Sequence, residues 1–166
     1  MGIDWAVCEK VVRGKRLGEL ASARVSTYRG VHLLRVAWLR AAVDYARTQN
    51  LALMSDTLAS WVHLKERKDA EQNEDEDDSE IMRGNIKLEA VDTLEPAAQS
   101  VMLGLVHFLL TVGQCDTCVS PGDAHQMWLA YQELRPFMRD EDTTWMDDFM
   151  PLCLLAFEKQ VLLVQH

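Results

Sequence analysis

Apolar and polar side chains alternate at helical spacing along most of this chain. The clearest segment spans residues 31–49, where apolar residues recur every three or four positions and charged residues occupy the opposite side. The apolar positions are Leu34, Trp38, Ala41 and Tyr45. This pattern predicts an amphipathic helix that packs one side on a core and ends near Asn50.

Two segments before it also predict helices. Asp4 is a suitable N-cap for a helix through residues 5–12, which fades at Gly14. Residues 17–28 give a second, weaker helical pattern. The beginning of the chain is therefore expected to be helical.

Four segments after it predict further helices. They begin at Ser55, at Thr93 with Pro96 in the first turn, at Asp123, and at Thr143 or Thr144. The last of them carries apolar residues as far as Leu162, and Pro151 either kinks it or opens a separate helix. Residues 101–112 are almost continuously apolar, which indicates a central, buried helix.

Residues 81–92 fit two descriptions. Ile86 and Leu88 alternate with polar residues, as in a short strand, but Gly84 and Asn85 fit a loop equally well. Glycine and proline are scarce elsewhere, which disfavours a sheet with many turns. The sequence therefore predicts an all-α single domain over residues 1–166, with six or seven helices in orthogonal or bundle-like packing.

The net charge of −9 is unevenly distributed along the 166 residues. Residues 1–70 have twelve basic and seven acidic side chains, residues 71–80 have seven acidic and no basic ones, and residues 81–166 have twelve acidic and five basic ones. The middle segment has nothing to bury and repels itself, so it is expected to be a solvated linker between two helical halves. So acidic a chain has no general attraction to phosphate, which argues against nucleic acid as a partner.

The sequence shows no membrane or export signal. The longest apolar runs, residues 101–106 and 152–157, are far shorter than the roughly 20 residues that cross a bilayer. The first residues lack the basic and apolar regions of a secretory signal. These features predict a cytoplasmic protein with reduced thiols and no membrane partner.

The densest group of ligand-type side chains is the turn with Cys115 and Cys118, between helices expected to end at Gly113 and begin at Asp123. A structural zinc site needs four ligands, and this pair supplies two, with His125 as a candidate third. A redox role requires such a pair at the start of a helix that follows a strand, which is not the context predicted here. The alternatives are a metal site on Cys115, Cys118 and His125, or two small residues in a helix–helix connection.

No catalytic or nucleotide-binding motif accompanies these residues. The five histidines are scattered, and the chain has no glycine-rich phosphate loop, no nucleophile elbow and no paired-histidine metal motif. We therefore expect a protein that is not an enzyme and uses no cofactor. An enzyme with an unfamiliar site is the alternative that a single sequence leaves open.

Acidic residues around one tryptophan mark the surface expected to bind a partner. Trp145 and Met146 lie at the start of the last predicted helix, beside acidic residues and after an acidic loop, and are the expected apolar anchors. An apolar side chain rimmed by acids suits a basic protein partner. The predicted contact residues are Glu74, Asp75, Glu76, Asp77, Asp78, Asp140, Glu141, Asp142, Trp145, Asp147 and Asp148.

These patterns favour binding of another protein over catalysis. In its most specific form the chain is an acidic neutraliser, which covers a basic protein as an immunity or antitoxin-type protein covers a basic nuclease. The alternative from another class is a helical metal-binding regulator built on the turn with Cys115 and Cys118. The oligomeric state is left open by the sequence.

Overall fold

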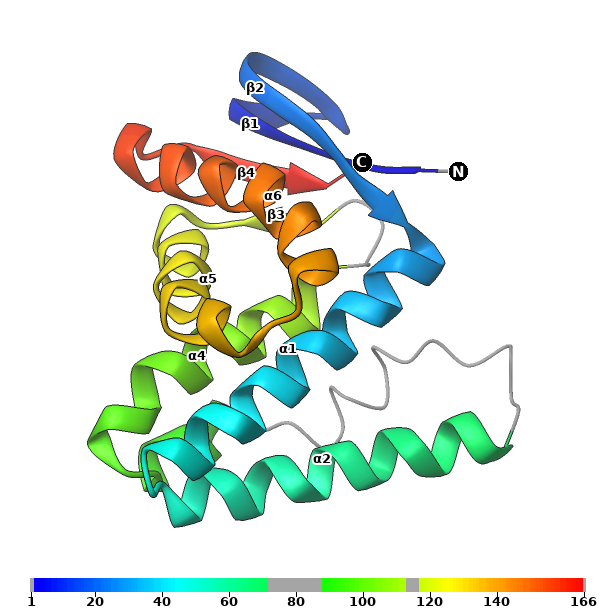
Figure 1. Ribbon diagram of the computed structural model, residues 1–166. Helices are drawn as coiled ribbons and strands as arrows, with labels where there is room; N and C mark the ends of the chain where they lie inside the picture. Colours follow the sequence, from blue (N-terminus) through cyan, green and yellow to red (C-terminus); the bar gives the residue numbers. More distant parts are fainter. Residues whose placement is uncertain (1, 72–87, 113–116, 166) are drawn as a thin grey trace.

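The fold combines helices with a sheet. The computed structural model describes residues 2–71, 88–112 and 117–165, and in these ranges it contains five α-helices and one four-stranded antiparallel sheet (Figure 1). The fold is therefore α+β, and the prediction of an all-α domain with six or seven helices is wrong. The elements in chain order are β1 (Gly2–Val12), β2 (Lys15–Thr27), α1 (Tyr28–Thr48), α2 (Ala52–Glu71), the 3-10 helix η1 (Leu88–Thr93), α4 (Pro96–Thr111), β3 (Cys118–Val119), α5 (Pro121–Leu134), the 3-10 helix η2 (Arg135–Phe137), α6 (Asp140–Lys159) and β4 (Leu162–Gln165).

The first two elements form a β-hairpin where the sequence predicted two helices. β1 and β2 pair antiparallel across a two-residue turn, in which Arg13 (φ 51°) and Gly14 (φ 73°) both have positive φ. A turn of this kind matches the right-handed twist of the strands that it joins. Gly14, which the helical interpretation took as a helix end, is therefore part of the hairpin turn. The β-branched Val11 and Val12 before it favour a strand.

The end of the chain completes the sheet. α6 ends at Lys159 and is capped by Gln160, whose φ of 54° is left-handed. Leu162, predicted as an apolar position of that helix, begins β4. β4 pairs with β1 on one side and with β3 on the other, so the strand order is β2-β1-β4-β3. Because β1 and β4 come from opposite ends of the chain, a local pattern of apolar residues cannot reveal their pairing.

Both faces of β1 are buried from Trp5 to Cys8. Trp5 and Val7 belong to the main core, with the helices on that side of the sheet (Figure 1). Ala6 and Cys8 belong to a small separate cluster with Val164 of β4. Successive side chains of a strand point to opposite faces, so a strand that is covered on both sides reads as a continuous apolar run. This is why residues 5–8 lack the alternation that would have predicted a strand.

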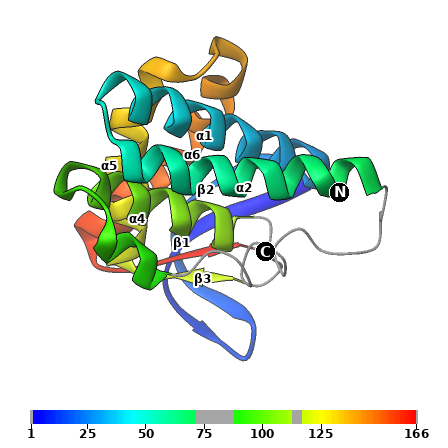
Figure 2. The ribbon, with the colours of Figure 1, turned by 90° about the horizontal axis from the view of Figure 1, so that it is seen from below.

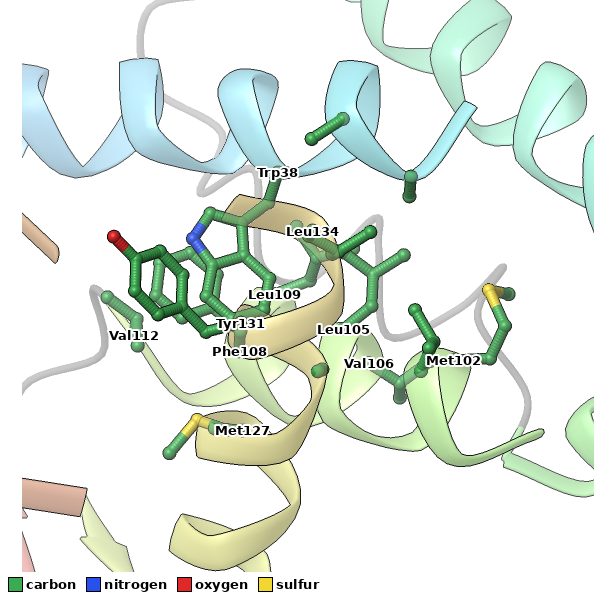
Figure 3. Close-up of a cluster of buried hydrophobic side chains, with 14 of the residues drawn as sticks. Trp38, Met102, Leu105, Val106, Phe108, Leu109, Val112, Met127, Tyr131 and Leu134 are labelled. Atoms are coloured by element: carbon green, nitrogen blue, oxygen red, sulfur yellow. The ribbon is translucent and has the colours of Figure 1, made fainter. Parts of the chain in front are cut away.

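The main core centres on Trp38 of α1 (Figure 3). Its ring stacks on Phe108 of α4 with centroids 4.0 Å apart, and its centroid lies 6.0 Å from that of Tyr131 of α5. Its indole nitrogen donates a hydrogen bond to the sulfur of Met146 on α6, at 3.0 Å. One side chain therefore ties α1 to three other helices.

α4 is the central, buried helix that the sequence predicted. Most of its residues after Ser100 are buried or half-buried. Gly104 allows α5 to approach closely, because a Cβ at this position would collide with the backbone oxygen of Gln126. The contact between α4 and α5 therefore depends on the absence of a side chain at one position.

The helices predicted after residue 30 are confirmed, with corrections at their ends. Ser120, rather than Asp123, is the N-cap of α5, since its hydroxyl accepts a hydrogen bond from the backbone N–H of Asp123 at 3.1 Å. The last helix begins at Asp140 instead of Thr143 or Thr144. Pro151 lies inside α6, so the segment is one helix rather than two.

Two further expectations concern the middle of the chain. Leu88–Thr93 is a 3-10 helix, so this part of the segment is not a strand. Residues 72–87, which include most of the predicted acidic linker, lie outside the described residues. In the ranges that are described, no helix is both long enough and apolar enough to cross a membrane.

Candidate functional site

α6 presents an exposed stripe that joins one aromatic side chain to two acids. Glu141, Trp145 and Asp148 follow one another at intervals of four and three residues, so they lie on the same side of the helix. All three are exposed, and Trp145 keeps 44% of its surface open to solvent. These three residues are called the α6 stripe below.

Local interactions fix the start of α6. The backbone carbonyl of Asp140 accepts hydrogen bonds from the hydroxyl groups of Thr143 (2.9 Å) and Thr144 (3.1 Å). Asp140, Glu141 and Asp142 occupy the first turn, where carboxylates stabilise the positive end of the helix dipole. The acids of the first turn therefore have a structural role that needs no partner.

The opposite side of α6 is fixed in the core. Met146 accepts the hydrogen bond of Trp38, and Phe149 packs edge-on against Trp5 of β1 with ring centroids 5.1 Å apart. Met146 and Phe149 are fully buried, so the expectation that Met146 serves as a second exposed anchor is wrong. Trp145 therefore lies on a helix that is anchored both to α1 and to the sheet.

Asp147, one of the predicted contact residues, forms hydrogen bonds within the chain. Its carboxylate accepts hydrogen bonds from the hydroxyl of Tyr131 (3.0 Å) and from two guanidinium nitrogens of Arg135 (3.1 and 3.4 Å). The hydrogen bond from Arg135 is the main cause that lowers the pKa of Asp147. Burial, followed by the bond to Asp147, raises the pKa of Tyr131 to about 12. Asp147 thus links the end of α5 to α6.

The other acids near the start of α6 differ in their exposure to solvent and in their contacts. Asp142 is half-buried, and burial followed by the charge of Glu141 raises the pKa of its carboxyl group. Glu141 lies 3.6 Å from Arg139, but both side chains are well exposed, so this ion pair contributes only about 0–1 kcal/mol. Within the described part of the chain, the carboxylates of Asp140 and Asp148 form no hydrogen bond or ion pair. Of the predicted acids between residues 140 and 148, Asp140, Glu141 and Asp148 are therefore exposed and free of strong intramolecular contacts.

The residues of the metal interpretation are only partly described. Cys115 lies outside the described residues, whereas Cys118 is exposed on β3. The ring of His125 stacks on Phe157 with centroids 3.8 Å apart. In residues 2–71, 88–112 and 117–165, no three His, Cys, Asp or Glu side chains gather closely enough to hold a metal ion.

Other reactive side chains are built into the packing. Cys8 and Cys153 are buried, and burial is the main cause that raises the pKa of both thiols. A raised pKa leaves little of the nucleophilic thiolate at neutral pH. His107 lies 3.4 Å from the carboxylate of Asp123, which links α4 to the start of α5.

One exposed region was not predicted from the sequence. The far end of the β1–β2 hairpin carries four bases and three exposed aliphatic side chains, and it is called the basic hairpin end (residues 10–20) below. Its bases are Lys10, Arg13, Lys15 and Arg16, and its exposed aliphatic residues are Val12, Leu17 and Leu20. The sequence does contain a signal, since residues 10–16 have four bases and no acid. The helical interpretation concealed it, because it placed Lys10 in one helix and Arg13, Lys15 and Arg16 in the connection to the next helix.

The remaining predicted contact residues lie in the acidic linker. Glu74, Asp75, Glu76, Asp77 and Asp78 are outside the described residues, so their part in binding stays a prediction. The structure therefore bears only on the second half of the predicted surface, between Asp140 and Asp148.

Comparison with known proteins identifies no relative. No protein-family model, no curated protein and no solved structure matches the chain. A function must therefore be inferred from the chemistry that the described surface displays.

Proposed function

We propose that this chain is a non-enzymatic protein-binding domain, and that its α6 stripe docks on a basic protein surface. The observation that carries the proposal is the exposure of Trp145. Trp145 keeps 44% of its surface in solvent. It lies between two exposed acids, on a helix whose opposite side is fixed in the core.

Exposure on this scale sets Trp145 apart from the other tryptophans. Trp5, Trp38 and Trp61 are buried, and Trp128 is half-buried. Tryptophan is enriched at the energetic centres of protein interfaces, where truncation to alanine typically costs about 2 kcal/mol or more of binding free energy. Its display on the surface supports a binding role.

Asp148 supports the proposal in a way that the acids of the first turn cannot. The helix dipole accounts for Asp140, Glu141 and Asp142, but its effect falls off within the first turn. Asp148 lies more than two turns into α6 and forms no hydrogen bond or ion pair in the described part of the chain. Unpaired negative charge beside an apolar anchor favours a basic partner, because it accelerates encounter and disfavours acidic competitors.

The anchoring of α6 makes the stripe suitable for tight binding. Trp145 and its flanking acids come from one helix that Met146 and Phe149 hold against α1 and the sheet. A surface that is already ordered loses little conformational entropy when it binds. The specific form of the function that we propose is therefore an acidic neutraliser, which covers the basic site of another protein.

The proposal is tested by comparing the proteins that wild type and two variants retain from a lysate. Trp145→Ala removes the anchor, and Leu53→Ala, on α2, is the matched control because Leu53 is a similarly exposed apolar side chain (53%) outside the stripe. We expect wild type and Leu53→Ala to retain basic proteins that Trp145→Ala does not retain. With the purified partner, Trp145→Ala should weaken binding at least tenfold, which corresponds to about 1.4 kcal/mol.

Equal retention by all three proteins would show that the stripe is not the binding surface. Retention of acidic rather than basic partners would contradict the charge argument. Circular dichroism of each variant confirms that the fold is intact before binding is compared.

A further inference from the structure

The basic hairpin end is the second exposed apolar and charged region of the molecule. Val12, Leu17 and Leu20 expose 45%, 41% and 48% of their surfaces. Four bases accompany them, and the hairpin has an ion pair at Arg16, which lies 3.7 Å from Glu19. In the described residues, Lys10, Arg13 and Lys15 have no ion-pair partner. This region therefore presents unsatisfied positive charge beside aliphatic side chains.

The hairpin reaches beyond the rest of the sheet. β4 pairs with β1 only from Trp5 to Cys8, and β1 continues from Cys8 to Val12 before the turn. Four residues of strand extend about 13 Å, which exceeds the screening length of about 8 Å at physiological ionic strength. The basic hairpin end can therefore interact with an acidic surface without strong repulsion from the acidic body of the chain.

The basic hairpin end and the α6 stripe lie on opposite sides of the molecule. In Figure 2 the start of α6, in orange, is at the top of the view, and the hairpin, in blue, extends from the bottom. The two surfaces cannot meet within one copy, although they complement each other in charge and both expose apolar side chains. Contact between two copies would cover both.

We propose that the basic hairpin end of one copy docks on the α6 stripe of a second copy. The inference rests on the proposed function, because it names a partner for the same stripe. Bases of the hairpin end would face Glu141 and Asp148, while its aliphatic side chains would pack on Trp145. A single contact would then pair charge of opposite sign and remove apolar surface from water on both sides.

A second copy fits the hairpin end better than a polyanion does. The exposed apolar residues of the hairpin end are aliphatic, and no aromatic residue occurs between residues 6 and 27 on which bases of a nucleic acid could stack. An anionic membrane could accept both the bases and the aliphatic side chains, but it would leave the α6 stripe uncovered. Of these partners, only a second copy covers both the basic hairpin end and the α6 stripe through one type of contact.

Side-chain docking is also favoured over strand addition. β2 is the outer strand of the sheet, but its register shifts twice and Gly18 has a left-handed φ of 66°. Bulges and basic side chains on an outer strand oppose pairing with another strand. The hairpin end therefore offers a partner its side chains rather than its free backbone groups.

The position of the two surfaces determines the type of assembly. Because different surfaces of each copy meet, the contact is heterologous, and it continues from copy to copy unless the rotation closes a ring. Sedimentation velocity should show wild type growing from monomers to dimers and larger species as its concentration rises. High salt should weaken the assembly, since charge pairs contribute to it.

Two complementary variants test the contact. Lys15→Ser/Leu17→Ser disables the hairpin end and leaves the stripe intact, whereas Trp145→Ser disables the stripe and leaves the hairpin end intact. Each variant alone should self-associate at least tenfold more weakly than wild type. An equimolar mixture should form a heterodimer that does not grow, because each copy supplies one intact surface and cannot extend the chain.

Several results would overturn the inference. They are wild type that stays monomeric at all concentrations, assembly that survives in either variant, and a mixture that does not form the heterodimer. Binding of monomeric wild type to phosphatidylserine vesicles or to RNA, lost in Lys15→Ser/Leu17→Ser, would assign the hairpin end to another anionic partner. If self-association fails while Trp145→Ala still loses a basic protein from a lysate, the proposed function stands and only this inference falls.

Discussion

The α6 stripe and the basic hairpin end both expose apolar side chains, but the molecule holds them in different ways. Trp145 of the stripe is next to Met146, which is buried against Trp38, and one turn from Phe149, which packs on Trp5. The hairpin end extends past the last residue that β4 pairs, and most of its side chains are exposed. The stripe is therefore ordered by the core, whereas the hairpin end is ordered mainly by its own turn.

This difference has a consequence for binding. An ordered helical surface selects a partner whose shape and charge match it, because its side chains lose little entropy on binding. A projecting hairpin has more freedom to adjust and opens at lower free energy than the core. We therefore expect the stripe to set specificity, and the hairpin end to adapt to the surface that it meets.

The largest expected effect comes from removing the anchor of α6. Phe149→Ala should lower the free energy of unfolding by about 3–5 kcal/mol, because Phe149 is fully buried between β1 and α4. The matched change in the other region, Leu20→Ala, should alter it by less than about 0.5 kcal/mol, since surface substitutions have small effects. Urea unfolding of both variants measures the two values. Similar losses of unfolding free energy in Phe149→Ala and Leu20→Ala would contradict the contrast between an anchored stripe and a projecting hairpin.

A smaller effect is expected from the hairpin turn. Gly14→Val should cost about 1–2 kcal/mol, because a β-branched residue is strained at φ 73°, where nothing else crowds the position. Hydrogen exchange should accelerate in residues 9–19 and remain unchanged in α6. Accelerated exchange of α6 as well would show that the hairpin end and the stripe are not independent.

The smallest effect concerns the acid that joins α5 to α6. Because folding lowers the pKa of Asp147, its ionised form stabilises the fold above the ordinary aspartate pKa of about 4, and this contribution is lost as the pH falls through the lowered value. Asp147→Asn should therefore be less stable than wild type at neutral pH, and the difference should narrow in acid. Thermal unfolding of both proteins across the pH range measures the difference in stability. A difference in stability that does not change with pH would contradict the assigned role of Asp147.

The helical part of the fold could be predicted because its signal is local. Leu34, Trp38, Ala41 and Tyr45 recur at the spacing of one helix side, and all four are buried in α1. The strands could not be predicted in this way. Burial on both faces removed the alternation from residues 5–8, and β4 exists only through pairing with strands that are distant in the sequence.

The site was predictable to the extent that it lies on one helix. Trp145 and its flanking acids are close in the sequence, so their composition indicated an exposed apolar anchor before the fold was known. The engagement of Asp147 was not predictable, because Tyr131 and Arg135 reach it from the preceding helix and turn. The basic hairpin end was missed because recognising it requires the turn at Arg13 and Gly14.

The central claim is that the α6 stripe is a protein-binding surface, and photo-crosslinking tests it most directly. The photoreactive residue p-benzoylphenylalanine replaces Trp145 in one form of the protein and Leu53, on α2, in a control form. Irradiation of cells that produce them should give a protein adduct from position 145 and none from position 53. Mass spectrometry should show that the attached peptide belongs to a basic surface of the captured protein. No adduct from position 145, or the same adducts from both positions, would contradict the claim.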